Sequence, residues 1–507
     1  MSSTDDRGVR GAPAGPDTPG STRFPRGFLF GAATASYQIE GAHDVGGRTP
    51  SIWDTYCREP GRVADGATGD IACDHYHRYR EDVALLRGLG VDSYRFSISW
   101  PRVQPDGAGP GNPEGLDFYD RLVDELLAAG ISPAATLYHW DLPQALEDRG
   151  GWRVRDTAEH FADYTRIAAE RLGDRVERWI TLNEPYCSAF VGYGAGAHAP
   201  GAREGRGALA AAHHLLVGHG LAVRALRETG ATDVGITLNP DVLLPATDSE
   251  ADLAAVRRAE TMHNDVWLEP LLAGRYPAHE ARTWGELADG TYRLDGDLAL
   301  IGAPLDFIGV NYYRPITVSA VPHRDPDPAT RSAVDIRAEE SWRQDVRRTT
   351  MGWPVVPHAF TDLLVGLRRR YPALPPLLIT ENGSSEDDRV DADGRIHDTD
   401  RVAYLRDHLA ALADAMDQGV DVRGYYVWSL LDNFEWARGY SKRFGIVRVD
   451  YDTLERVPKD SYRWYRDLIA AHRDRDRDGD HPRDGGDHAR DRTHSGTRTT
   501  GQELHHR

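Results

Sequence analysis

The sequence is poor in lysine and in cysteine, and each shortage excludes classes of protein. Only Lys442 and Lys459 are lysines among 507 residues, so arginine supplies nearly all of the positive charge. The formal net charge is −19, and because a phosphate backbone needs a basic face, nucleic-acid binding is disfavoured. Cys57, Cys73 and Cys187 are odd in number and show no C-x-x-C spacing. They indicate neither a disulfide framework nor a zinc site, and they fit a reducing compartment.

Long apolar runs and nucleotide-binding motifs are absent as well. No run reaches the roughly 18 apolar residues of a bilayer span, and the N-terminus lacks a basic region followed by an apolar stretch. We therefore expect a soluble, cytoplasmic protein without a membrane partner. Neither G-x-x-x-x-G-K-[ST] nor a G-x-G-x-x-G between a strand and a helix occurs, which disfavours a nucleotide enzyme. The histidine pairs at 213–214 and 75–77 lack the i, i+4 spacing of two ligands on one helix face, so we expect no metal.

Composition divides the chain into three parts. Residues 1–22 are rich in Gly, Pro, Ser, Thr and Asp and cannot bury enough apolar surface to order themselves, so we expect a disordered tail there. Residues 472–507 are dominated by Arg, Asp, His and Gly with alternating charges, which predicts a second disordered, solvated tail. Between them, 23–471 shows no linker, so we expect one domain.

Eight short apolar or β-branched runs punctuate that domain, and helical patterns separate most of them. One such pattern covers 120–129, with Leu122, Val123, Leu126 and Leu127 expected on one face. Alternating strands and helices imply a parallel sheet, and eight repeats favour closure into a single (β/α)8 TIM barrel. The runs cover 30–33, 93–97, 132–138, 178–182, 234–238, 307–310, 377–380 and 422–429.

The gaps between these runs are uneven. Those between the first and second runs and between the fifth and sixth exceed one helix with two short loops. Several βα loops must therefore be long, and they are expected to enclose a deep pocket at the carboxyl ends of the strands, where barrel enzymes place their active sites.

Two carboxylates occur where predicted strands end, each inside a distinctive pentapeptide: Glu184 in TLNEP and Glu381 in ITENG. An arbitrary glutamate is most often a structural ion-pair partner. Cleavage of a glycosidic bond, however, needs a proton for the leaving oxygen and a negative group at the anomeric carbon, and two carboxylates about 5 to 5.5 Å apart supply both. While Glu381 is ionised it raises the proton affinity of Glu184; once Glu381 is esterified, Glu184 can act as a base.

Six motifs in order resemble those of family 1 glycoside hydrolases of the β-glucosidase type, over residues 24–469. The resemblance implies a retaining mechanism with Glu184 as acid/base, Glu381 as nucleophile and no cofactor. The matching motifs are FLFGAATASYQIEG at 28–41, YRFSISW at 94–100, LYHWDLP at 137–143, the two glutamate pentapeptides, and VWSLLDNFEW at 427–436.

The same resemblance assigns the remaining site residues. Trp428 is expected to form an aromatic floor under the sugar, since the C–H faces of a sugar favour aromatic surfaces, and Trp353 to stack on the leaving group. Polar and aromatic residues expected around the terminal sugar are Gln38, His139, Trp140, Asn183, Glu435 and Trp436. Arg95, Asn311 and Tyr313 are expected to support the nucleophile.

Glu435 bears on the substrate class. Relatives acting on 6-phosphorylated glycosides carry a smaller neutral residue there, because a carboxylate would repel the phosphate. This chain keeps Glu435, and it has Phe444 where the phospho-specific pattern tends to have Tyr. Lys442 fits the phosphate-binding pattern but also occurs in ordinary members. We give Glu435 more weight and expect an unphosphorylated sugar.

The sequence thus predicts a β-glucosidase that removes terminal non-reducing β-D-glucosyl residues, with β-galactosyl or β-fucosyl residues as further substrates, from small glycosides or cello-oligosaccharides. A transglycosylase and a 6-phospho-β-glycosidase of the same fold are alternatives. A sugar-binding pseudoenzyme is an alternative from another class, but it predicts loss of one glutamate and both are present. Oligomeric state stays open.

Overall fold

A computed structural model describes residues 24–320, 337–339 and 346–478, and the tail expected over 1–22 lies outside this range. Eight parallel strands close into a barrel in the order β1-β11-β10-β7-β5-β4-β3-β2, which confirms the predicted fold class. The strands are β1 (Leu29–Ala33), β2 (Ser93–Ser97), β3 (Ser132–Tyr138), β4 (Arg178–Asn183), β5 (Asp233–Leu238), β7 (Phe307–Asn311), β10 (Leu377–Asn382) and β11 (Val422–Trp428).

Each predicted run is one of these strands, with ends that differ by no more than two residues. The barrel strands are buried along most of their length because helices cover the outside and side chains fill the inside; all six residues of β10 are buried. The register pairs Glu381 with Asn311 of β7 and Asn183 with Thr237 of β5. The ends of β10, β7, β5 and β4 therefore lie next to one another.

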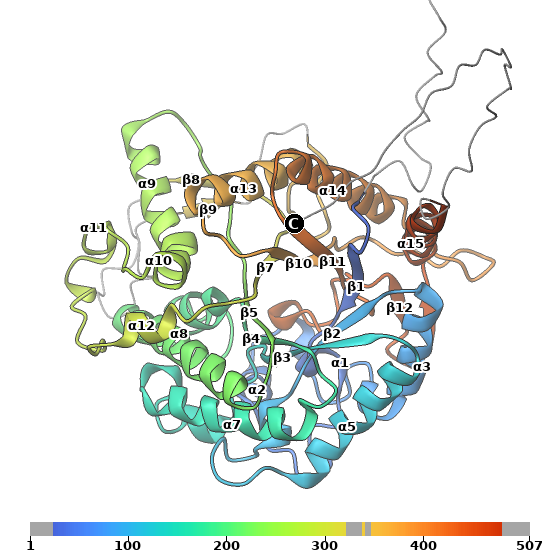
Figure 1. The fold of residues 1–507 in the computed structure, drawn as a ribbon, viewed down its shortest axis with the longest axis horizontal. Coiled ribbons are helices and arrows are strands. Elements are labelled where there is room, and N and C mark those ends of the chain that lie inside the picture. The colour runs from blue at the N-terminus through green and yellow to red at the C-terminus, as the bar shows by residue number, and fades with distance from the viewer. Residues whose placement is uncertain (1–23, 321–336, 340–345, 479–507) are drawn as a thin grey trace, which may run out of the picture.

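Helices surround the barrel (Figure 1). They are α1 (Ser36–Ile39), α2 (Ile52–Arg58), α3 (His75–Leu89), α4 (Trp100–Val103), α5 (Pro113–Ala128), α6 (Gln144–Glu147), α7 (Asp156–Leu172), α8 (Gly205–Glu228), α9 (Glu250–Glu260), α10 (Val266–Ala273), α11 (Glu280–Trp284), α12 (Asp297–Ile301), α13 (Pro357–Arg370), α14 (Thr399–Asp417) and α15 (Asp460–Asp478).

Helix α5 shows how sequence pattern becomes packing. Pro113 at its first position lacks the N–H that would be unsatisfied there, and Leu122, Val123 and Leu126 are buried against the barrel. Leu127, which the sequence pattern places on the same face, is 42% exposed. That prediction was wrong because successive residues are rotated by about 100° around a helix, which puts Leu127 at the edge of the apolar stripe.

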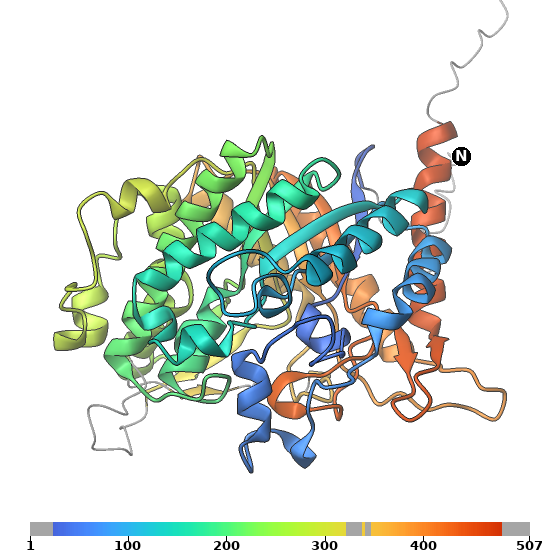
Figure 2. The same ribbon diagram turned by 90° about the horizontal axis from the view of Figure 1, so that it is seen from below.

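The long βα loops carry structure of their own. Between β5 and β7 the chain forms β6 (Leu243–Pro245) and helices α9 to α12, and β6 pairs with β8 (Ile316–Ser319), which pairs with β9 (Arg337–Glu339). A further small sheet joins β12 (Val447–Val449) to β13 (Arg456–Pro458). In the view of Figure 2 the strands of the barrel are seen from the side, with helices and loops on both flanks.

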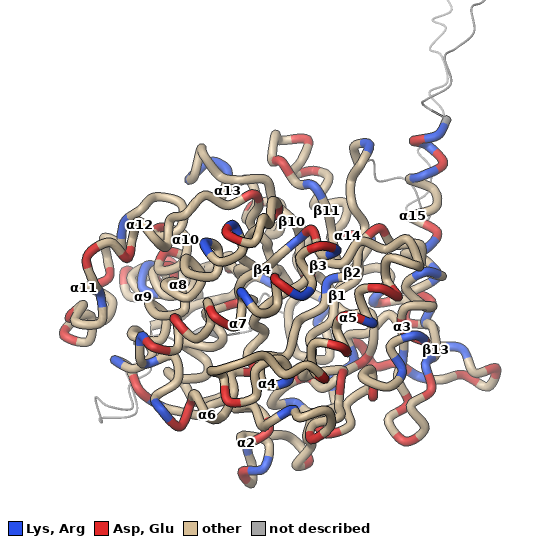
Figure 3. The backbone as a smooth tube through the Cα atoms, turned by 60° about the horizontal axis from the view of Figure 1, so that its bottom comes forward, with Lys and Arg blue, Asp and Glu red and all other residues tan. Residues whose placement is uncertain are grey.

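The boundary expected at 471 for the charged C-terminal tail was wrong, because α15 continues to Asp478. His472 is buried and its ring lies 5.3 Å from that of Phe30, and Arg473 pairs with Asp92. Acidic and basic positions alternate along this helix (Figure 3). Alternating charges, from which we predicted disorder, are therefore compatible with a helix that packs on the barrel by one face. The rest of the expected tail, 479–507, lies outside the described residues.

No helix in the described part of the chain is long and apolar enough to span a bilayer. The same residues contain no group of three or more His, Cys, Asp or Glu side chains placed to hold a metal ion.

Candidate active site

A cavity of about 700 Å³ opens at the carboxyl ends of the barrel strands. It contains most of the residues that the sequence singles out. Those that line it are His139, Trp140, Glu184, Asn311, Tyr313, Trp353, Glu381, Trp428, Glu435, Trp436 and Phe444. Gln38, Arg95 and Asn183 do not line it; Arg95 and Asn183 contact residues at the same strand ends, and Gln38 contacts the loop after β11 that carries Glu435.

Glu381, near the end of β10, has a hydrogen-bond donor on each carboxyl oxygen. Arg95 reaches it from β2, with Nη1 2.6 Å from Oε1. Tyr313, just beyond β7, donates its phenol to Oε2 at 2.6 Å. Arg95 is 1% exposed, so its charge acts on Glu381 with little screening by water.

Glu184 follows β4 directly, and its backbone lies in the left-handed region with φ of 44°. This conformation is uncommon for a residue with a side chain. It is held by a hydrogen bond from the backbone N–H of Glu184 to the carbonyl of Thr237 on β5. The carboxyl accepts from Asn311 Nδ2 at 2.6 Å on Oε1 and from the Cys187 thiol at 3.3 Å on Oε2. Both donors are neutral, unlike the guanidinium beside Glu381.

A chain of hydrogen bonds connects the two carboxyl groups. Arg95 Nη2 donates to Asn183 Oδ1 at 2.6 Å, and Asn311 Nδ2 donates to the same oxygen at 3.1 Å as well as to Glu184. Thr380 orients Asn311 by donating to its Oδ1 at 2.7 Å. Because Arg95 and Asn311 each contact one carboxyl and share Asn183, the relative placement of Glu184 and Glu381 is fixed by three buried side chains.

Burial and charge give the two carboxyl groups different proton affinities. Burial, followed by repulsion from Glu381, raises the pKa of Glu184 to about 8. Burial also raises the pKa of Glu381, but Arg95 and the phenol of Tyr313 oppose that rise. At neutral pH the arrangement therefore favours a protonated Glu184 beside an ionised Glu381.

Aromatic rings form one wall of the cavity. Trp428 ends β11, and the ring of His139 stacks against it at 5.9 Å and against Trp436 at 5.9 Å. Trp140 lies 4.5 Å from Trp436 and donates its indole N–H to the carbonyl of Asn183. Burial and the charge of Arg95 keep the pKa of His139 well below its usual value, so its ring is neutral.

His139 also has a defined tautomer. Asn183 Nδ2 lies 3.1 Å from Nε2, and since an amide nitrogen only donates, Nε2 accepts and the ring proton is on Nδ1. Nδ1 is buried and has no hydrogen-bond partner among the described residues. It is therefore a buried donor without a partner in that part of the chain, on a residue that lines the cavity.

Gln38 on α1 lies beside the segment that precedes Glu435. Its Nε2 donates to Asn433 Oδ1 at 3.0 Å and to the carbonyl of Phe434 at 2.9 Å. Its Oε1 is buried without a partner in the described residues, which leaves an acceptor of fixed position.

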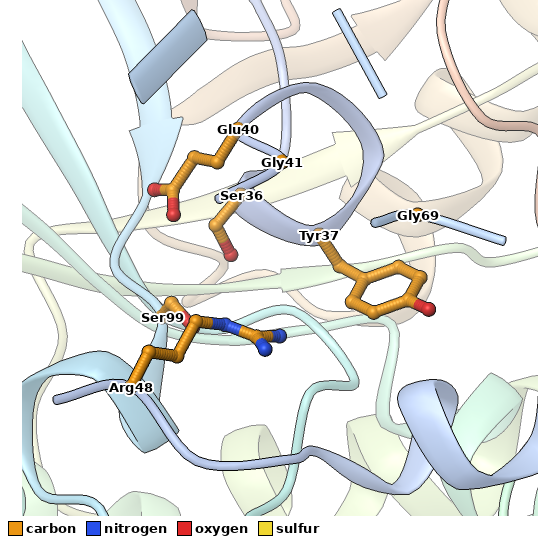
Figure 4. A pocket seen from close by; sticks show the side chains of 7 residues that line it. All are labelled: Ser36, Tyr37, Glu40, Gly41, Arg48, Gly69 and Ser99. Atoms are coloured by element: carbon orange, nitrogen blue, oxygen red, sulfur yellow. The ribbon is translucent and has the colours of Figure 1, made fainter. Parts of the chain in front are cut away.

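A small polar hollow lies next to α1 (Figure 4). There Ser36 donates to the buried Asp141 at 3.0 Å, and burial raises the pKa of Asp141 to about 7. Arg48 pairs with Asp54 at 2.8 Å. The bond from Ser36 to Asp141 ties α1, which carries Gln38, to the segment after β3 that carries His139 and Trp140. The hollow is lined by Ser36, Tyr37, Glu40, Gly41, Arg48, Gly69 and Ser99.

The outer part of the cavity is aromatic on one side. Trp353 lies 5.5 Å from Tyr313 and 5.8 Å from Phe444, and the guanidinium of Arg314 stacks on it at 4.7 Å. Glu435 faces the two catalytic candidates, and burial, together with the charges of Glu381 and Glu184, raises its pKa to about 8.

Lys442 does not line this cavity; its Nζ donates to the carbonyl of Thr350 at 2.6 Å. The one lysine near the site that fits a phosphate-binding pattern is thus engaged by the backbone.

Several lining residues were not found from the sequence. Asn239 and Asp241 come directly after β5, so the strand-end rule would have found them. Tyr186 and Arg314 follow β4 and β7 just as closely, so the same rule covers them, whereas His198 and His263 belong to long loops whose path depends on tertiary packing. Tyr186 and His263 stack at 4.3 Å, and Asp241 accepts from His263 at 2.8 Å.

The chain resembles known proteins over most of its length. The sequence model of glycosyl hydrolase family 1 matches residues 20–474. Thermostable β-glucosidase B of Thermobispora bispora is 50% identical over 91% of this chain and 93% of its own. A bifunctional β-D-glucosidase/β-D-fucosidase of Bifidobacterium breve is 48% identical over 89% of this chain and 98% of its own.

A crystal structure of a psychrophilic β-glucosidase from Micrococcus antarcticus superposes with a TM-score of 0.84 at 49% identity, covering 89% of this chain and 98% of that one. Identity at this level over the whole barrel shows common descent as well as a shared fold. The chain belongs to glycosyl hydrolase family 1.

Proposed function

We propose that this protein is a retaining β-glucosidase in which Glu381 is the nucleophile and Glu184 the acid/base. Its substrates are terminal non-reducing β-D-glucosyl residues, with β-D-fucosyl or β-D-galactosyl residues also accepted. The observation that carries the proposal is the pair of carboxyl groups in one cavity, one held by a guanidinium and a phenol and the other by neutral donors.

In the first step Glu381 attacks the anomeric carbon while Glu184 gives its proton to the glycosidic oxygen, and the C–O bond to the aglycone breaks. Formation of the ester removes the negative charge of Glu381. The repulsion that raises the pKa of Glu184 then ends, so Glu184 remains ionised after losing its proton.

In the second step Glu184 takes a proton from water, and the resulting hydroxide adds to the anomeric carbon from the side that the aglycone left. The bond to Glu381 breaks and the carboxylate is restored. Two inversions give net retention of the β-configuration.

The sugar site combines an aromatic floor with polar groups of fixed direction. Trp428 provides the floor, Nδ1 of His139 is a donor, and Oε1 of Gln38 is an acceptor. Asn183 is held by Arg95 and Asn311 next to Glu184, and we expect it to bond the 2-hydroxyl, where hydrogen bonds strengthen in the transition state. A sugar hydroxyl both donates and accepts, so these groups match it.

Glu435 and Lys442 together support an unphosphorylated sugar. Glu435 repels a phosphate in the cavity when its carboxyl is ionised, and the lysine that fits the phosphate pattern is bound to a backbone carbonyl. The proposal therefore excludes 6-phospho-β-glycosides as main substrates.

Cello-oligosaccharides fit the outer cavity, where Trp353 offers a face on which a second sugar can stack. A role in cellulose breakdown is part of the proposal. A cytoplasmic location is also part of it, and three cysteines without disulfides fit that compartment. Activity measured in separated cell fractions tests the location.

The decisive experiment is turnover of a panel of p-nitrophenyl β-glycosides with NMR of the first sugar released. Faster release from the glucoside than from the 6-phosphoglucoside, with the β-anomer formed first, is expected. An α-anomer as the first product contradicts the mechanism. Cellobiose with an added alcohol separates hydrolysis from transglycosylation, since a transglycosylase yields mainly the alkyl glucoside.

A further inference from the structure

The thiol of Cys187 touches the carboxyl of Glu184, and the reaction described above gives it no role. Its sulfur lies 3.3 Å from Oε2 of Glu184 as a donor. Cys187 begins the π-helical segment Cys187–Gly194, and its backbone N–H donates to the carbonyl of Glu184 at 2.9 Å. One turn of the backbone therefore holds the thiol and the carboxyl together.

Asn239 contacts the same thiol. It follows β5, the neighbour of β4 in the barrel (Figure 1), and its Nδ2 lies 4.0 Å from the sulfur. An amide nitrogen only donates, so the sulfur accepts from Asn239 and its own hydrogen is directed to Glu184. Both residues line the cavity.

The two oxygens of Glu184 have unequal partners. Asn311 donates to Oε1 at 2.6 Å, which keeps that oxygen an acceptor, whereas Oε2 has, among the described residues, only the thiol as a donor, at 3.3 Å. The proton of the acid form therefore belongs on Oε2. A thiol is both a weak donor and a weak acceptor, so it can stay beside Oε2 whether that oxygen carries a proton or a charge.

We infer that Asn239 and Cys187 form a hydrogen-bond relay that positions Oε2 of Glu184 for proton transfer to the leaving oxygen and from the attacking water. Cys187 is a positioning residue in this relay. The inference rests on the proposed role of Glu184 as acid/base.

Other groups also act on Glu184, and they come from several elements. They include Glu381 on β10 and Arg95 on β2, whose charges act on it, and the thiol of Cys187, whose pKa burial raises so that it stays protonated. Apart from the thiol itself, none of these groups is altered when residue 187 is replaced. The remaining groups nearby are Tyr313 after β7, Glu435 after β11 and Asp241 after β5.

The test is the pH dependence of kcat/KM for Cys187→Ala and Cys187→Ser. A donor to the carboxylate lowers the pKa of Glu184, so its loss in Cys187→Ala moves the alkaline limb to higher pH, by about half a unit. Cys187→Ser keeps a donor and moves the limb back towards the wild-type position. Asn239→Ala is expected to move it in the same direction as Cys187→Ala, by less.

Leaving groups give a second measurement. Cys187→Ala should lose more rate on cellobiose than on 2,4-dinitrophenyl β-glucoside, because only the former needs the proton. Cys57→Ala is the matched control, since Cys57 is buried, contacts Tyr37 and lies outside the cavity lining; its limb should stay at the wild-type pH.

The relay would be refuted if both Cys187 variants kept the alkaline limb and the leaving-group dependence of the wild type. It would also be refuted if they lost equal rates on the two substrates while the alkaline limb stayed in place. Failure of the wild-type protein to hydrolyse any aryl β-glycoside would instead refute the proposed function.

Discussion

Glu381 and Glu184 share one cavity, but their surroundings differ in charge and in the strength of their bonds. Glu381 has a buried guanidinium and a phenol at 2.6 Å each. Glu184 has an amide at 2.6 Å and a thiol at 3.3 Å, and the charge of Glu381 acts against its ionisation. The same side chain is thus adapted to two tasks: one carboxyl is kept available as an anion, and the other retains its proton until the leaving group needs it.

The two roles are separated most strongly by Glu381→Ala. Without a nucleophile no glycosyl ester forms, and kcat on p-nitrophenyl β-glucoside should fall by at least about 10⁴-fold. Azide enters the space left by the carboxyl and attacks from that side, so NMR should show an α-glycosyl azide. Glu386→Gln is the control: Glu386 pairs with Arg347 outside the cavity lining and should retain activity. Formation of the β-glycosyl azide by Glu381→Ala would show that the roles of Glu381 and Glu184 are the reverse of those assigned.

Glu184→Ala removes the proton donor and leaves the nucleophile in place. Cellobiose hydrolysis should fall by about 10² to 10⁴-fold, whereas formation of the glycosyl ester from 2,4-dinitrophenyl β-glucoside should change little, because that leaving group departs without a proton. Stopped-flow release of dinitrophenol measures the first step alone. Azide should now give the β-glycosyl azide, the opposite anomer to that of Glu381→Ala. Equal losses on both substrates would contradict the acid role.

Arg95→Met removes the positive charge that lies beside Glu381. Loss of the guanidinium raises the pKa of Glu381, so the acidic limb of kcat/KM should move to higher pH, and activity at neutral pH should fall by about 10²-fold. Breaking this buried ion pair should also cost about 3–5 kcal/mol of unfolding free energy, measured by urea denaturation.

Arg95→Lys keeps the charge but lacks the fork that contacts both Glu381 and Asn183. It should therefore return the acidic limb of kcat/KM part of the way to its wild-type pH without restoring the full rate. An acidic limb that stays in place in Arg95→Met would show that Arg95 does not govern the ionisation of Glu381.

The barrel itself was predictable because each strand is a short buried run with turn residues around it. Glu184 and Glu381 were found for the same reason, since both follow such runs, at the ends of β4 and β10. Their partners Arg95, Asn311 and Tyr313 came only from the family resemblance. Nothing in the local sequence of β2 says that Arg95 contacts a residue 286 positions away.

What could not be predicted depends on packing between distant segments. Helix α15 extends past residue 471 because His472 packs on Phe30 and Arg473 pairs with Asp92, contacts invisible in a run of alternating charges. His263 lines the cavity because it stacks on Tyr186 from another loop. The spacing of the predicted strands identifies such loops as long, but it does not give their paths.

Tyr313→Phe is the smallest change in the comparison, since it removes one hydroxyl that donates to Oε2 of Glu381. The acidic limb should move to higher pH by less than in Arg95→Met, and kcat/KM at neutral pH should fall by about tenfold. Tyr312→Phe is a matched control, because the ring of Tyr312 stacks on Phe360 at 4.6 Å and its buried hydroxyl has no hydrogen-bond partner among the described residues.

The control variant should therefore keep both the rate and the limb of the wild type. A lower rate at every pH with an unmoved limb in Tyr313→Phe would show that the phenol acts on the substrate and not on Glu381. The guanidinium would then be the main group that distinguishes the two carboxyls, and the phenol would belong to the sugar site with His139 and Gln38.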